Sequence, residues 1–335
     1  MVRTIQGKQV GNIGFGLMGL TWRAGKLPDE EMFAVIKAAL ESGCNYLNGG
    51  EFYGPADNNS LTLLNSYFAK YPEDRDKIVL NIKGCADPAK HYAPDGTPEG
   101  VKASVENCVR LIGGKGRIDQ FEPARKDPNT DIEVTIAALQ EQVKAGNIGG
   151  ISLSEVSAAT LRRAAKVAKI ESVEVELSLW CTEPLENGLA EACAELDIPI
   201  LAYSPLGRGM LTGQIKSFDD IPEGDFRRMV PRFQPDVFEQ NLRLVREVEK
   251  LAAKKGCTPG QVAIGWVLAL NKRPGMPTII PIPGASKPER VRENAVEIDL
   301  TDEDMAELDR ISRELAPVGT RYPEFAMKLL DTSTA

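Results

Sequence analysis

The chain has 335 residues, of which 42% are hydrophobic and 26% are charged, and its net charge is −8 at neutral pH. This is the composition of a globular protein with a sizeable core, and the acidic balance argues against nucleic-acid binding, which needs a basic excess. The chain has neither an uncharged apolar run of about 18 residues nor a secretory h-region, so we expect a cytoplasmic protein without a membrane partner. Six scattered cysteines without a CxxC pair predict reduced, packed thiols and no metal site.

Short apolar runs alternate with amphipathic segments along the chain. The predicted strands are residues 12–15, 45–47, 78–82, 118–121, 149–153, 172–177, 199–203 and 278–281. The predicted helices are residues 29–42, 58–70, 98–111, 132–145, 158–167, 185–196, 237–255, 261–270, 288–296 and 302–311. Eight strands, each followed by helical sequence, predict a (β/α)8 TIM barrel that forms one domain over residues 1–335. A hairpin around Gly7 and Lys8 is expected to plug the N-terminal end of this barrel.

Residues 14–19, GFGLMG, match the GxGxxG fingerprint and raise the alternative of a doubly wound dinucleotide-binding fold. In that fold the third glycine opens a helix at once, whereas Gly25 and Pro28 would break a helix here. The second strand should also end in an acidic residue, but it ends at Asn48. The barrel is therefore the favoured fold.

The C-terminal ends of the predicted strands carry candidate catalytic residues, as expected for a barrel enzyme. Tyr53 follows the second strand in the stretch NGGEFYG, and Lys83 ends the third strand. A poorly hydrated cation beside a tyrosine favours the phenolate and lowers the tyrosine pKa, which would make Tyr53 a usable proton donor near neutral pH. The structural alternative is a lysine whose charge reaches solvent and a tyrosine that only packs.

Several segments, in chain order, resemble the aldo-keto reductases. Residues 48–54 (NGGEFYG) stand where that family usually has Asp-Thr-Ala-x-x-Tyr-Gly, and residues 82–84 (IKG) match its strand-three lysine. Residues 118–128 (IDQFEPARKDP) overlay Ile-Asp-Leu-Tyr-Gln-Leu-His-Arg-Pro-Asp-Pro, and the similarity continues at residues 153–155, 175–180, 202–213 and 282–294. The resemblance implies a barrel that binds NADPH and reduces an aldehyde or ketone to an alcohol.

The resemblance also implies a set of cofactor-binding residues. They are Gly16, Met18, Ser154, Glu155, Glu174, Tyr203, Ser204, Leu206, Arg208, Ser286, Arg290, Glu293 and Asn294. By this resemblance Ser154, Glu155 and Glu174 would hold the nicotinamide carboxamide, and Tyr203 would stack on the ring. The pyrophosphate would be lined by Ser204, Leu206 and Arg208, and the adenosine would be held by Ser286, Arg290, Glu293 and Asn294. Arg290 suits a 2′-phosphate, because a guanidinium can bind phosphate through paired hydrogen bonds, and this favours NADPH over NADH.

Two positions depart from the family's tetrad of Asp, Tyr, Lys and His. Asn48 replaces the aspartate and Ala124 the histidine, while His91, the only histidine, lies in another loop and is expected to be solvated. Asn48 can orient Lys83 through its carbonyl oxygen but carries no charge to offset it. We therefore expect a less compensated Lys83, a Tyr53 drawn further toward phenolate, and extra room above the nicotinamide.

The stretches NGGEFYG and ARKDP, together with GFGLMGLTW at residues 14–22, resemble one branch of the family, the fungal pyridoxal reductases. This implies reduction of pyridoxal to pyridoxine. We hypothesise that the phenolic hydroxyl next to the aldehyde polarises the carbonyl in place of the missing histidine. Four residues are either substrate contacts or ordinary packing, namely Trp22, Phe52, Arg125 and Trp180.

Two other functions stay open. One is a broad-specificity aldehyde or ketone reductase, whose pocket is enlarged where the histidine is missing. The other is a slow NADPH-binding sensor subunit that resembles the potassium-channel β subunits. For the reductase readings the partner is a small-molecule aldehyde, and we expect a monomer or a weak homo-oligomer.

Overall fold

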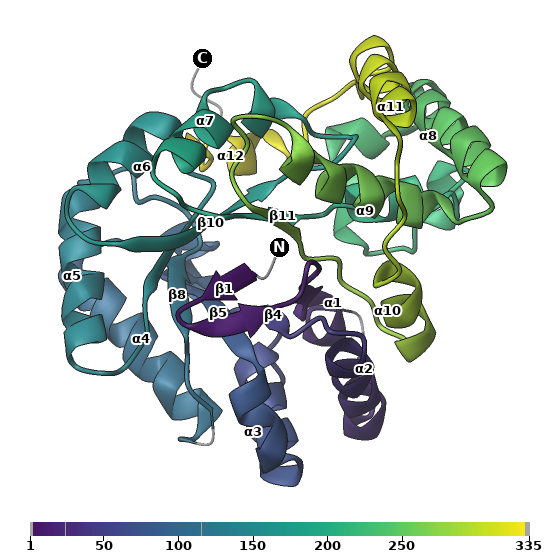
Figure 1. The fold of residues 1–335 in the computed structure, drawn as a ribbon. Coiled ribbons are helices and arrows are strands. Elements are labelled where there is room, and N and C mark those ends of the chain that lie inside the picture. Colours follow the sequence, from purple (N-terminus) through teal and green to yellow (C-terminus); the bar gives the residue numbers. More distant parts are fainter. Residues whose placement is uncertain (1–2, 24, 115, 332–335) are drawn as a thin grey trace.

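The computed structural model describes residues 3–23, 25–114 and 116–331. Within these residues, eight parallel strands form the central sheet, and the bridge between Gly16 and Gly284 joins its two edges. Figure 1 looks along the resulting barrel, with helices around it. The strands are β3 (Phe15–Gly16), β4 (Tyr46–Gly50), β5 (Val79–Gly84), β8 (Gln120–Pro123), β9 (Ile151–Ser154), β10 (Ile170–Glu176), β11 (Ile200–Tyr203) and β12 (Ile279–Pro281). The predicted (β/α)8 barrel is confirmed, and the doubly wound alternative is wrong.

The predicted helices are present, with ends that differ by a few residues. They are α2 (Asp29–Glu41), α3 (Ser60–Lys70), α4 (Pro98–Ile112), α5 (Ile132–Lys144), α6 (Ala158–Ala165), α7 (Leu189–Glu195), α8 (Pro235–Lys255), α9 (Pro259–Ala269), α10 (Pro288–Asn294) and α11 (Asp302–Glu314). The prediction missed α1 (Met18–Thr21), α12 (Glu324–Met327) and the small hairpin of β6 (Ala86–Asp87) and β7 (Ala93–Pro94). These elements are too short to give a periodic signal.

Side-chain caps set several helix starts. The Asn59 side chain accepts hydrogen bonds from the backbone N–H groups of Leu61 and Thr62, and the Thr62 hydroxyl accepts one from the Asn59 N–H. This capping box satisfies donors that the first helical turn leaves without partners. The start of α3 is thereby fixed just after the loop that carries Tyr53.

The N-terminal hairpin covers one end of the barrel, as predicted. It consists of β1 (Arg3–Ile5) and β2 (Lys8–Val10), joined through Gln6 and Gly7, which both have positive φ. Ile5 and Val10 are buried in a cluster with Tyr46 and further apolar side chains of the barrel interior. In Figure 1, β1 lies at the centre of the ring of strands. The end that carries the loops after the strands is therefore the one open to ligands.

The main core lies between the helices and the sheet. All six cysteines have free thiols and five of them are buried, which confirms that they pack as apolar side chains. Among the described residues, no helix has both the length and the apolar character needed to cross a membrane.

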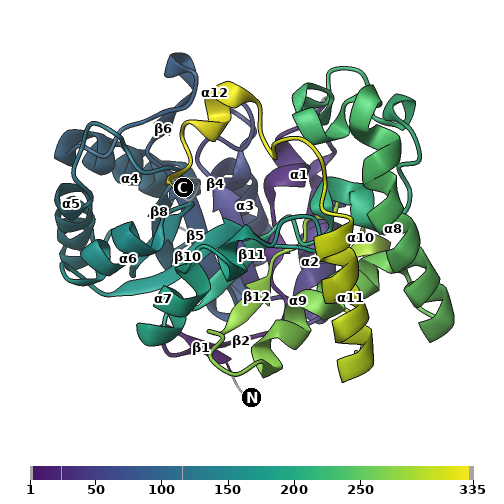
Figure 2. The ribbon, with the colours of Figure 1, turned by 90° about the horizontal axis from the view of Figure 1, so that it is seen from above.

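After α11 the chain returns to the open end of the barrel. Val318 exchanges two hydrogen bonds with the Asn241 side chain, of 2.8 and 2.9 Å, and Gly319 turns the backbone with a φ of 93°. Beyond α12, the Asp331 carboxylate accepts a 2.8 Å hydrogen bond from the Ser157 N–H. Figure 2 shows this segment in yellow, on the side opposite the N-terminal hairpin. We call residues 318–331 the C-terminal strap.

Candidate active site

Tyr53 and Lys83 meet at the open end of the barrel. The ring of Tyr53 is 8% exposed and lies against Gly50, where a Cβ atom would come within 2.8 Å of the ring. Strand β4 therefore does not end at Asn48 but continues to Gly50, whose missing side chain leaves space for the tyrosine. The ammonium nitrogen of Lys83 lies 6.0 Å from the centre of the Tyr53 ring. The predicted tyrosine–lysine pair is thus brought together.

Lys83 has two buried carboxyl partners that were not predicted from the sequence. Its Nζ lies 2.5 Å from Glu174 Oε1 on β10 and 3.1 Å from Glu122 Oε1 on β8. Burial alone would lower the pKa of Lys83, but the negative charge of Glu122 and Glu174 outweighs burial and raises it. The expectation of a poorly compensated lysine is therefore wrong.

The expected shift of Tyr53 toward phenolate is also wrong. Burial raises the pKa of Tyr53 to about 12, against the opposing effect of Lys83, and the carboxyl groups of Glu174 and Glu122 act in the same direction as burial. The cation beside the tyrosine is therefore outweighed by the loss of hydration and by its own counter-ions. Tyr53 carries its proton at neutral pH.

Asn48 acts on Lys83 indirectly. Its amide nitrogen donates a 2.5 Å hydrogen bond to Glu174 Oε2 and lies 3.5 Å from Glu122 Oε1. The expected contact from its carbonyl oxygen to the lysine is replaced by this bridge through Glu174. An amide suits the position because it can donate to a carboxylate, whereas an aspartate would add a third carboxylate to the cluster.

The residues predicted to hold the nicotinamide carboxamide differ in whether their side chains already have hydrogen-bond partners. The Glu174 oxygens are bound by Lys83 and Asn48. By contrast, the hydroxyl of Ser154 is buried and has no hydrogen-bond partner within the described residues. A buried hydroxyl without a partner is costly, and a ligand amide would satisfy it. Ser154 therefore fits the predicted role better than Glu174.

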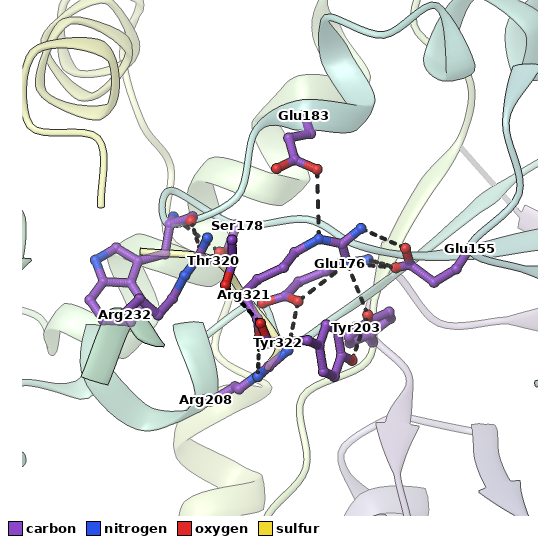
Figure 3. Close-up of polar contacts among 11 residues, drawn as sticks. Glu155, Glu176, Ser178, Glu183, Tyr203, Arg208, Arg232, Thr320, Arg321 and Tyr322 are labelled. Atoms are coloured by element: carbon purple, nitrogen blue, oxygen red, sulfur yellow. Dashed lines mark hydrogen bonds and ion pairs between the residues drawn. The ribbon is translucent and has the colours of Figure 1, made fainter. Parts of the chain in front are cut away.

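Glu155, Tyr203 and Arg208, also predicted to bind the cofactor, are bound by the C-terminal strap (Figure 3). Arg321 pairs with both oxygens of Glu155, at 3.1 and 2.6 Å, and donates to the Tyr203 hydroxyl. Arg208 donates a 2.6 Å hydrogen bond to the Arg321 carbonyl oxygen. The Tyr322 and Tyr203 hydroxyls are 2.9 Å apart. Arg321 and Tyr322 were not predicted from the sequence, because they lie beyond the segments that carry the resemblance.

The arginines around Glu155 keep it ionised despite its burial. Desolvation would raise its pKa, but Arg321, with a further contribution from Arg125, lowers it to about 2. Arg208 forms a second ion pair nearby, 2.8 Å from Glu176. This side of the barrel mouth is therefore a closed network of guanidinium and carboxylate groups.

The residues predicted for the adenosine end lie across the edge where the barrel closes. Gly16 bridges Gly284, two residues before Ser286, and the helix α10 that follows carries the other predicted residues, Arg290, Glu293 and Asn294. Arg290 lies 2.6 Å from Glu293 and remains half exposed, so its guanidinium can reach a ligand. In the loop after β11, Ser204 and Arg208 have positive φ and Leu206 is partly buried against the core. Met18 is exposed on α1.

Aromatic side chains surround Tyr53. Trp22 lies 5.5 Å from the Tyr53 ring, Phe52 lies 5.2 Å from it, and Tyr92 contacts both Trp22 and Phe52. Trp22 is 43% exposed and so presents a free aromatic surface next to the candidate proton donor. Tyr92 was missed, since a loop tyrosine carries no pattern of its own.

The other predicted substrate residues are more scattered. The apolar neighbours of Tyr53 include Ala124, in the position of the missing histidine. Arg125 lies near the mouth, with its guanidinium 5.8 Å from the Tyr322 ring. Trp180 instead packs in the core against Phe233. His91 is exposed, as predicted.

Comparisons with known proteins agree with this geometry. The Aldo/keto reductase family matches residues 12–313. A probable pyridoxal reductase 2 of Schizosaccharomyces pombe is 40% identical over 326 residues, which cover 95% of this chain and 96% of that protein. A putative pyridoxal reductase of Saccharomyces cerevisiae is 43% identical over 331 residues, which cover 92% of this chain and 95% of that protein.

Among solved structures, a glycerol dehydrogenase of Gluconobacter oxydans superposes with a TM-score of 0.79 at 25% identity, and the alignment covers 95% of this chain and 97% of that one. Proteins of this family use nicotinamide cofactors and act on small molecules. The chain therefore belongs to the aldo/keto reductase family and is an oxidoreductase.

Proposed function

We propose that this protein reduces an aldehyde with NADPH, and that pyridoxal, converted to pyridoxine, is its substrate. The proposal rests above all on one observation, the buried Tyr53 held beside Lys83 at the mouth of the barrel. It is supported by two relatives at 40% and 43% identity whose names describe pyridoxal reductases.

In this proposal Tyr53 is the proton donor. Its raised pKa means that the proton is present at neutral pH, and the Lys83 ammonium stabilises the phenolate that forms when the proton leaves. Asn48 acts through Glu174 to keep Lys83 in place. Bound NADPH supplies the hydride for the carbonyl carbon.

The cofactor would lie across the residues predicted for it. The unpaired hydroxyl of Ser154 fits the carboxamide, and Arg290 on α10 fits the 2′-phosphate that distinguishes NADPH from NADH. If so, Arg290→Met raises KM for NADPH about tenfold and leaves KM for NADH within about twofold, since one charge-assisted bidentate contact contributes on the order of 1.5–3 kcal/mol. Equal changes for both cofactors would argue against this role.

The substrate would bind beside Trp22 and Phe52, whose rings suit a flat aromatic aldehyde. Ala124 offers no hydrogen-bond donor at the histidine position. The phenolic hydroxyl of pyridoxal can hydrogen-bond its own neighbouring aldehyde and so polarise it. An analogue without this hydroxyl should be reduced much more slowly. Equal turnover of both compounds would contradict the polarisation of the aldehyde by the phenolic hydroxyl.

The first experiment is to follow the absorbance of reduced nicotinamide with pyridoxal, for the wild type and for Tyr53→Phe. The variant should lose at least ~100-fold in kcat, the typical contribution of a general acid, while binding NADPH as the wild type does. Equal activity in the two proteins would exclude Tyr53 as the acid. Tight NADPH binding without oxidation in either protein would favour the slow sensor, and similar rates with unrelated aldehydes would favour the broad reductase.

A further inference from the structure

The cluster around Lys83 contains more acidic groups than basic ones. Glu122 and Glu174 lie within 3.1 Å and 2.5 Å of the same ammonium nitrogen, and the exposed fractions of the two glutamates are 0% and 2%. Asn48, which contacts both, is uncharged. Two ionised carboxylates would therefore leave one buried negative charge without compensation.

An uncompensated buried charge is costly, and a carboxyl group relieves that cost by holding a proton. The hydrogen bonds indicate which glutamate holds it. Glu174 receives two donors, one from Lys83 and one from Asn48, each at 2.5 Å. Glu122 Oε2 is buried without a hydrogen-bond partner among the residues described. The anionic form is thus better supported at Glu174.

We propose that Glu122 and Glu174 form a proton-sharing carboxyl pair that serves as the counter-ion of Lys83, with the negative charge on Glu174 and the proton on Glu122. The pair supplies, from β8 and β10, the negative charge that Asn48 does not carry. Both glutamates are positioning residues, since they act through Lys83.

The surroundings of the pair agree with this placement. Burial and the charge of Glu174 raise the pKa of Glu122, against the opposing effect of Lys83. Among the described residues, Tyr46 on β4 and Tyr53 also face the pair, and their own pKa values are raised, so that both are neutral at pH 7. Lys83 is therefore the cation that fixes the charge of the pair at minus one.

Infrared difference spectroscopy on the folded protein tests the proton directly, without substrate or cofactor. The wild type should show the C=O band of a buried protonated carboxyl at neutral pH, with a shift in D2O. The band should be absent in Glu122→Gln. It should also be absent in Glu174→Gln, because Glu122 loses its like-charged neighbour and ionises to become the counter-ion. A band that persists in either variant, or is missing in the wild type, overturns the proposal.

Asp119→Asn is the matched control. Asp119 is a buried carboxylate at the other end of the barrel, 3.2 Å from both Lys8 and Arg75, and its removal should leave the band in place. Loss of the band in this variant would assign it elsewhere and overturn the proposal.

The positioning role rests on the proposed function and is tested by kinetics. Each single glutamine variant keeps one carboxyl for Lys83 and should lose no more than about tenfold in kcat, whereas Glu122→Gln/Glu174→Gln should lose at least ~1,000-fold, far more than the product of the two losses. KM should change less than kcat. Losses that simply multiply would overturn the shared role. If the wild type reduces no aldehyde at all, the proposed function fails, while the infrared result still decides where the proton is.

Discussion

Glu122 and Glu155 are equally buried, yet their pKa values shift in opposite directions. Glu155 is held by both Nη atoms of the Arg321 guanidinium, with Arg125 nearby, and its pKa falls to about 2. Glu122 shares one ammonium with a second carboxyl group, and its pKa rises. Burial thus does not decide the charge of a carboxyl group at this barrel mouth. The number of cations per carboxyl group does.

Replacing Lys83, the cation that Glu122 and Glu174 share, should destabilise the fold most. Lys83→Met leaves Glu122 and Glu174 without a counter-ion, and the expected loss in unfolding free energy at neutral pH is about 3–5 kcal/mol, together with loss of activity. Since the folded state then holds protons that the unfolded state releases, the destabilisation should grow as pH rises and shrink toward acid. Urea denaturation across pH measures this.

Lys8→Met is the control for that experiment. Lys8 is partly exposed and its partner Asp119 keeps Arg75 and the Leu80 N–H, so the expected loss is below about 1 kcal/mol. A similar loss of unfolding free energy in both lysine variants would mean that stability does not depend specifically on the cation shared by Glu122 and Glu174.

The ion pair between Glu155 and Arg321 predicts that the fold loses stability in acid. The folded pKa of Glu155 lies below its ordinary value of 4.5, so its ionisation stabilises the fold above that pH, and the stabilisation is lost as pH falls toward about 2. The shift corresponds to about 3 kcal/mol. Glu155→Gln should lose about this much at neutral pH and little at the acid end. An unchanged acid limb in urea denaturation would contradict the low pKa.

The smallest of the three effects concerns Asn48. Asn48→Asp places a third carboxyl group 2.5–3.5 Å from the other two. We expect a loss of about 1–3 kcal/mol in unfolding free energy at neutral pH, which increases with pH. Asn48→Ala, which removes the donor without adding charge, should lose less. A gain in stability or activity for Asn48→Asp would show that the cluster has room for another negative charge.

Much of the fold and part of the site could be predicted from the sequence. The alternation of apolar runs with amphipathic segments predicted the barrel, and the short motifs located Tyr53 and Lys83. The ends of the first five barrel strands were predicted one to three residues too early, because strands such as β4 run on from apolar residues into the functional ones.

The charges around these residues could not be predicted in the same way. Glu122 was visible as a glutamate within an apolar strand, but its contact with Lys83 depends on the pairing of β5 with β8. Arg321 and Tyr322 lie outside any repeating pattern, and only the tertiary fold brings them to Glu155 and Tyr203. A sequence motif identifies a residue's type and place, whereas its ionisation depends on neighbours from distant strands.

The ion pair between Glu155 and Arg321 joins residues 166 positions apart. During synthesis, the ribosome therefore releases Glu155 and most of the barrel long before the guanidinium that balances it has been made. In a nascent chain that has all eight strands but not yet the strap, Arg321 does not yet balance the charge of Glu155, and Arg125 is the nearby cation that remains. The strap follows all eight strands in the chain, so this side of the barrel mouth gains its balancing cation only after the strands have been made.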